Sequence, residues 1–186
     1  MGECMRVTVF GGSQPKLGEE PYQQAQRLGE LIGTAGYTVL TGGYIGTMEA
    51  VSRGAFEAGG HVIGVTCDEI ESWRPVAPNP WVQEEIRFPT LRQRLYALID
   101  ECDVAMALPG GIGTLTEIAT MWSQMQTGIS PRRPLILIGA GWEAVIDTFI
   151  GCMGVYTADK YRQMISFAPD VESAFLLLQS SISESQ

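Results

Sequence analysis

The sequence predicts a three-layer α/β fold, in which a parallel sheet is covered on both faces by helices. Three observations lead to this class. Short apolar runs alternate with longer amphipathic segments along the chain. The apolar runs are continuous, which is typical of parallel strands buried on both faces. Glycine-rich turns follow three of these runs. A length of 186 residues is most simply one domain, residues 1–186, with a sizeable core.

The first half of the chain is expected to form three strands and two helices. Val7–Phe10 is an apolar run, and residues 21–35 then carry apolar side chains at helical spacing. Gly36 ends this helix. The turn TGGYIGTME at 41–49 opens a second helix, which Gly59 ends. The second and third strands are expected at Tyr37–Leu40 and His61–Thr66.

The second half of the chain starts with an irregular segment. Residues 67–81 are expected to form a stiff loop, because they hold several prolines and two tryptophans. Strands are then expected at 82–88, 104–108, 134–138 and 164–167. Helices are expected at 90–101, 114–125, 142–150 and from Pro169 onward, and residues 180–186 are expected to be a disordered tail.

The charge balance limits the kinds of partner. The chain has 21 acidic residues against 12 basic ones, a net charge of −9, which argues against nucleic-acid binding because such binding needs a basic surface. A small phosphorylated ligand needs only a local site. No apolar segment reaches the roughly eighteen residues of a membrane helix. The N-terminal segment carries an acid where a signal peptide is basic, and either Met1 or Met5 could be the start.

The cysteine and histidine content argues against a metal site. The four cysteines are far apart and form no CxxC pair, so we expect reduced thiols in a cytoplasmic protein without a zinc site. His61 is the only histidine, and it is expected to be packed rather than catalytic. Neither Lys16 nor Lys160 lies in a pattern typical of a Schiff-base site, so a pyridoxal-phosphate enzyme is not expected.

Three glycine-rich turns follow predicted strands, and the carboxyl ends of parallel strands meet at one edge of a sheet. Glycine lets a ligand approach the backbone closely, and a helix N-terminus offers free N–H groups and partial positive charge. Both features suit a phosphate group. The predicted phosphate-binding residues are Gly12, Ser13, Gly42, Gly43, Gly46, Gly110, Gly111, Gly113 and Thr114.

The third turn, LPGGIGTLTE at 108–117, has two interpretations that the residues alone leave open. Thr114 and Glu117 have the spacing of a capping box, in which the threonine caps the helix and the glutamate bonds back to it. Alternatively, the N–H groups hold an anion beside Glu117. The turns 42–47 and 110–114 match neither a Walker loop nor a GxGxxG dinucleotide fingerprint.

Two arginines are candidates for the same site. At about 100° per residue, Arg94 borders the apolar stripe of helix 90–101 and can lean toward Glu117, whereas Arg92 lies across the helix. For each of them the alternative is a solvated surface arginine, which is the commoner case.

These motifs resemble one known family. PGGIGTLTE at 109–117 matches the PGGxGTxxE signature of the Lonely Guy (LOG) family, the cytokinin riboside 5′-monophosphate phosphoribohydrolases formerly mislabelled "lysine decarboxylase-like". VFGGSQP at 9–15 and TGGYIGTMEAVSRGAFEAGGHVIGV at 41–65 are similar to further parts of the family. The resemblance covers nearly the whole chain. It implies a Rossmann-like fold and a catalytic pair formed by Arg94 and Glu117.

The resemblance also implies a reaction, hydrolysis of the N-glycosidic bond of an N6-modified adenosine or other nucleoside 5′-monophosphate. It implies no metal or cofactor, a small-molecule partner and a homodimer. Two departures from the family pattern bear on the substrate: Leu95 replaces a lysine after the arginine, and Glu49 stands where a glycine is common. The alternative is a non-catalytic protein of the same fold that binds a nucleotide or carries molybdenum cofactor.

Overall fold

The computed structural model describes residues 4–183 and confirms the α/β class. Its seven strands form one sheet, and every neighbouring pair is parallel. In spatial order the strands are β4 (Glu84–Phe88), β3 (Val62–Cys67), β2 (Thr38–Thr41), β1 (Arg6–Phe10), β5 (Val104–Ala107), β6 (Leu135–Ile138) and β7 (Ile165–Ala168). The arrangement is that of a Rossmann-like fold.

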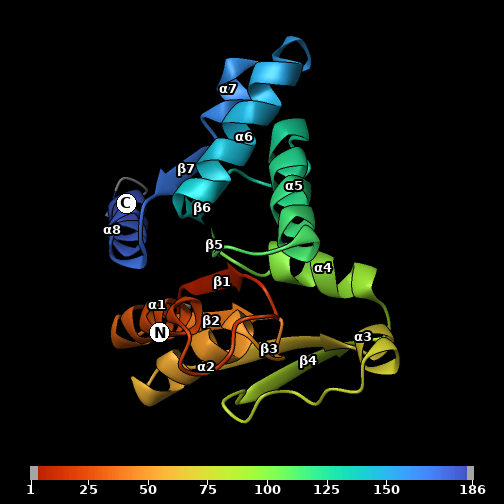
Figure 1. The fold of residues 1–186 in the computed structure, drawn as a ribbon, viewed down its shortest axis with the longest axis vertical. Helices are drawn as coiled ribbons and strands as arrows, with labels where there is room; N and C mark the ends of the chain where they lie inside the picture. Colours follow the sequence, from red (N-terminus) through yellow and green to blue (C-terminus); the bar gives the residue numbers. More distant parts are fainter. Residues whose placement is uncertain (1–3, 184–186) are drawn as a thin grey trace.

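Helices cover both faces of the sheet, which makes the three predicted layers (Figure 1). One face packs against α1 (Glu20–Thr34), α2 (Thr47–Glu57) and α8 (Val171–Ser183). The other packs against α4 (Leu91–Asp100), α5 (Ile112–Thr127) and α6 (Ala140–Met153). Neighbouring residues of a strand enter different cores: Val9 belongs to the first core and Phe10 to the second.

The strand order contains a switch point between β1 and β5. From β1 the chain adds β2, β3 and β4 outward on one side, and from β5 it adds β6 and β7 on the other. In open α/β sheets, ligands bind beyond the carboxyl ends of the strands at such a point. The segments that follow β1 and β5 are the first and third glycine turns.

Three expectations about local structure are wrong. The segment 67–81 is not all loop, since Asp68–Trp73 forms the short helix α3. Acidic side chains in its first turn favour that helix through its dipole. A 3₁₀ turn, Gly154–Tyr156, and helix α7, Asp159–Arg162, follow α6 where no element was expected. Residues 180–183 are not a tail but the last turn of α8, and 184–186 lie outside the described residues.

His61 is not packed in the interior as expected. It is exposed, and its Nε2 lies 3.1 Å from Glu84 Oε2 on the neighbouring strand. The cysteine at 102 is buried, and burial raises the pKa of its thiol to about 11. Within residues 4–183, no helix is long and apolar enough to cross a membrane.

Candidate functional site

The three glycine turns lie side by side at the carboxyl edge of the sheet. Thr47, the first residue of α2, donates to the carbonyl oxygen of Gly12 from its backbone N–H at 2.9 Å and from its hydroxyl at 3.0 Å. A Cβ on Gly46 would lie 2.5 Å from the same oxygen, and a Cβ on Gly110 would lie 3.2 Å from Gly12 N. The first turn is therefore packed between the second and the third.

The third turn leads into α5 with its backbone open. Gly111 is the extended residue before the helix, and no side chain caps it. A Cβ on Gly111 or Gly113 would meet no other atom within 4 Å, so the space beside this helix end is free. The first turn of a helix has N–H groups without intrahelical partners. This end of α5 can therefore bind an anion.

The capping box is not formed, so that interpretation of the third turn is wrong. A capping threonine must take the extended conformation in front of the helix. Gly111 occupies that position, and Thr114 is already the third helical residue. Its side chain is buried and packs where a Cβ of Gly110 would lie. Glu117 is thereby left without a capping role.

Arg94 is buried, with 6% of its surface exposed, so it is not a solvated surface arginine. Helix α4 starts at the capping residue Thr90, whose hydroxyl accepts from Gln93 N at 3.2 Å. One turn further on, Arg94 donates from Nε to the Val65 carbonyl at 2.7 Å and from Nη2 to the Gly42 carbonyl at 3.1 Å. The guanidinium is thus held against strand β3 and the residue that follows β2.

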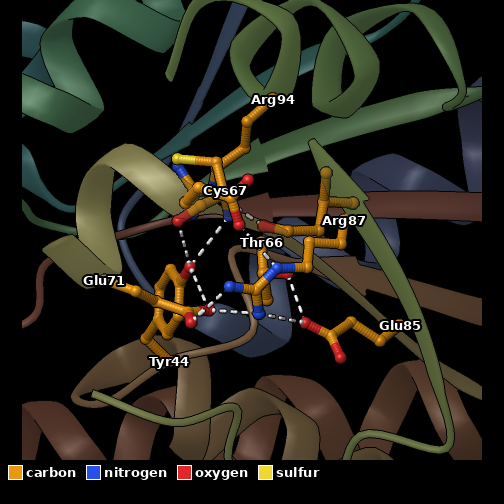
Figure 2. Close-up of polar contacts among 9 residues, drawn as sticks. Tyr44, Thr66, Cys67, Glu71, Glu85, Arg87 and Arg94 are labelled. Carbon is orange, nitrogen blue, oxygen red and sulfur yellow. Dashed lines mark hydrogen bonds and ion pairs between the residues drawn. The ribbon is translucent and has the colours of Figure 1, made fainter. Parts of the chain in front are cut away.

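Behind Arg94 lies a polar cluster that sequence reasoning missed (Figure 2). The Arg94 guanidinium carbon lies 5.7 Å from the centroid of the Tyr44 ring, at the distance of a cation–π contact. The Tyr44 hydroxyl donates to Glu71 at 3.2 Å, and it accepts from Cys67 N at 2.9 Å. Arg87 in turn holds Glu71 with two hydrogen bonds, at 2.7 and 3.0 Å. The aromatic residue inside a glycine turn was the only signal in the sequence for this cluster.

Glu117 lies one turn into α5, and it lines the same cavity of about 640 Å³ as Arg94. The residue is partly buried. Loss of solvent around the carboxyl raises its pKa to about 7, although the Arg94 charge works in the opposite direction. The structure shows no hydrogen bond or ion pair between these two described side chains. Glu117 and Arg94 therefore line the same cavity without forming an ion pair across it.

The rest of the cavity wall is mainly apolar. Leu91, Leu95, Tyr96 and Ile112 contribute to it, and the exposed Arg92 lies at its edge with its guanidinium 5.8 Å from the Tyr96 ring. Glu69 is a second acid in the wall, and its Oε2 accepts a hydrogen bond of 2.8 Å from Leu91 N. A flat aromatic group would find apolar contacts here beside the Glu117 carboxyl and one buried cation. Across residues 4–183 no group of three or more histidine, cysteine or acidic side chains could hold a metal ion.

Comparison with known proteins gives the site a context. Residues 4–144 match the SLOG cluster4 family. The chain is 30% identical over 187 residues to an Escherichia coli pyrimidine/purine nucleotide 5′-monophosphate nucleosidase, covering 92% of this chain but only 40% of that protein. It is 31% identical to the rice cytokinin riboside 5′-monophosphate phosphoribohydrolase LOG, covering 96% of this chain and 74% of the relative.

A solved structure shows the same fold over the full length. The molybdenum cofactor binding protein of the phototrophic bacterium Rippkaea orientalis matches with a TM-score of 0.77 and 25% identity. The match covers 98% of this chain and 99% of that one. Similar proteins therefore include both hydrolases named for a nucleotide substrate and a protein named for cofactor binding.

Proposed function

The chain belongs to the SLOG cluster4 family, and we propose that it hydrolyses the N-glycosidic bond of nucleoside 5′-monophosphates, giving a free base and ribose 5-phosphate. The observation that carries this proposal is the placement of Glu117 and the buried Arg94 in one cavity, next to the open start of α5. The similarity to the nucleosidase of Escherichia coli and the rice phosphoribohydrolase supports the same class of reaction.

The start of α5 suits the 5′-phosphate. The backbone N–H groups of residues 110–114 and the hydroxyl of Ser13 supply donors, and the helix dipole adds partial positive charge. The glycines at 111 and 113 leave room for a phosphate to approach the backbone. The ribose then extends toward Glu117, one helical turn further along α5.

Glu117 suits the cleavage step. As the C1′–N bond breaks, positive charge develops on the ribose, and a carboxylate beside it stabilises that charge. The water oxygen forms the new bond to C1′, and Glu117 accepts a proton of that water. The electron pair of the broken C1′–N bond stays on the leaving nitrogen, which takes up a proton from solvent. With a pKa of about 7, Glu117 can accept a proton as a general base near neutral pH. Arg94 keeps part of the Glu117 population ionised.

The deciding experiment is incubation of the purified protein with AMP, N6-isopentenyl-AMP and the pyrimidine monophosphates, followed by chromatography for released base. Release of base from at least one monophosphate, and its loss in a folded Glu117→Ala variant, is the expected result. No release from any of them would overturn the proposal.

A second candidate function is binding of molybdenum cofactor without catalysis. The full-length match to the Rippkaea orientalis protein favours it, as does Leu95 in the position of the lysine in the LOG pattern. Under this function a pterin chromophore co-purifies with the protein, and none of the nucleoside monophosphates is cleaved. A protein that cleaves AMP and carries no pterin would exclude it.

A further inference from the structure

The second acid in the wall of the proposed site, Glu69, is held in a fixed position. It belongs to α3, where Asp68 and Glu71 on either side of it each pair with Arg87 of β4 at 2.7 Å. Its own Oε2 accepts the hydrogen bond from Leu91 N at the start of α4. The Glu69 carboxyl is therefore fixed between α3 and α4, although the residue is exposed.

Glu69 and the nearby Arg92 each keep polar groups available to a ligand. Within residues 4–183 the structure shows no hydrogen bond to the other oxygen of Glu69 and no ion pair between Glu69 and Arg92. Arg92 follows Leu91 on α4 and lines the same cavity, with its guanidinium carbon 5.8 Å from the Tyr96 ring centroid. An acceptor anchored at Leu91 and the donors of the next residue are therefore both open to a ligand in this cavity.

The proposed function defines which part of a nucleotide reaches these two side chains, and the inference rests on it for that reason. With the phosphate on residues 110–114 and C1′ beside Glu117, the base extends from C1′ into the rest of the cavity. The volume of about 640 Å³ is in the range of small-molecule sites and has room for the base. Apolar side chains of α4 offer contacts to the faces of the base, and Glu69 and Arg92 remain for its polar edge.

We propose that Glu69 and Arg92 select bases that carry an amino group beside an unprotonated ring nitrogen on their Watson–Crick edge, as adenine and cytosine do. The amino group donates to Glu69, and the ring nitrogen accepts from Arg92. Hypoxanthine and uracil present the reverse pattern, a carbonyl oxygen beside a ring N–H. Their carbonyl oxygen would face the Glu69 carboxyl and their N–H the Arg92 guanidinium, so both hydrogen bonds would be lost.

The test compares pairs of substrates that differ only at this edge. The wild-type kcat/KM for base release is expected to be higher by about tenfold or more for AMP than for IMP, and for CMP than for UMP. Glu69→Gln keeps an acceptor for Leu91 N but can also donate to a carbonyl oxygen, so both ratios should fall toward unity through faster cleavage of IMP and UMP. Arg92→Leu should reduce both ratios through slower cleavage of AMP and CMP. Glu143→Gln, which changes an exposed acid on α6 outside the cavity wall, is the matched control and should keep both ratios.

Binding measured without turnover separates this inference from the proposed function. Calorimetric titration of AMP and IMP into Glu117→Gln should give the tighter dissociation constant for AMP, and the further change Glu69→Gln should remove the difference. The melting temperature checks the fold of each variant. The inference is overturned if AMP binds no more tightly than IMP, if neither pair of substrates shows a preference, or if Glu69→Gln leaves the preferences unchanged. If no monophosphate is cleaved but Glu69→Gln removes a calorimetric preference for AMP, the proposed function fails and the role of Glu69 in base selection stands.

Discussion

The guanidinium of Arg94 lies over the ring of Tyr44, 5.7 Å from its centroid, and this contact connects the catalytic candidate to a cluster of charges behind it. Tyr44 is fully buried, and its hydroxyl is held by the backbone of Cys67 and by Glu71. The orientation of Arg94 therefore depends on residues that never enter the cavity. This relationship leads to the first prediction.

Tyr44→Leu removes the aromatic face and is expected to raise the pKa of Glu117 above about 7, since a less fixed Arg94 offsets desolvation less well. Tyr44→Phe keeps the ring and should leave that pKa close to its wild-type value. The measurement is a ¹³C NMR titration of the Glu117 carboxyl. Equal values in all three proteins would mean that Tyr44 has no influence on the charge at the site.

The pH dependence of activity follows from the same acid. The carboxylate form of Glu117 is the active one in the proposed reaction, so kcat/KM should rise with pH through about 7 and level off above it. Glu117→Gln should lower kcat by roughly 100-fold or more and remove this rise. Initial rates of base release between pH 5 and pH 9 provide the test. A profile that falls through pH 7 contradicts the base role.

The free energy of unfolding should change with pH in the opposite direction to the activity, through titration of the same Glu117 carboxyl. The pKa of Glu117 is raised in the folded state, so the folded protein holds its proton more tightly than the unfolded chain does. Stability is therefore lost as pH rises from about 4.5 to about 7, by at most about 3 kcal/mol. Glu117→Gln should be the more stable protein at pH 8, with a smaller difference at pH 5. Urea unfolding at the two pH values measures this, and a difference independent of pH would contradict it.

Gly42 should tolerate no side chain. A Cβ there would collide with Arg94 Nη2 and lie 2.5 Å from the Met48 sulfur. Gly42→Ala should therefore cost about 1–3 kcal/mol of unfolding free energy and also abolish base release, because Arg94 must move. Gly151→Ala in α6 is the matched control, because a Cβ there meets nothing within 4 Å. Denaturant unfolding and the hydrolysis assay test both variants. A Gly42→Ala protein as stable and active as the control would refute the close fit.

The fold could be predicted from the sequence because its evidence is local. Continuous apolar runs, helical periodicity and glycine turns each act within a few residues, and they located all seven strands to within about two residues. Helix α3 was missed because the prolines after it dominate the segment. The start of α5 was misplaced because Thr114 and Glu117 have the spacing of a cap that Gly111 makes unnecessary.

The site could be predicted only in part. The third glycine turn and the spacing of helix 90–101 made Glu117 and Arg94 candidates, and the family resemblance implied that they form a pair. Both residues line one cavity in the structure. The cluster around Tyr44 depends on strand register instead. Thr66 pairs with Arg87 across β3 and β4, and this register brings Arg87 to Glu71. No spacing within a single segment encodes such a contact.

As sequences diverge, Arg94 and Glu117 would be retained for different reasons. Arg94 satisfies the carbonyl groups of Val65 and Gly42, so selection for folding alone preserves it even in a relative without activity. The structure shows no hydrogen bond to the carboxyl of Glu117 among the described residues, and its burial is a net cost above neutral pH. Selection would therefore keep Glu117 only where it serves a reaction or binds a ligand. Loss of Glu117, rather than loss of Arg94, would therefore identify a relative that has no catalytic activity.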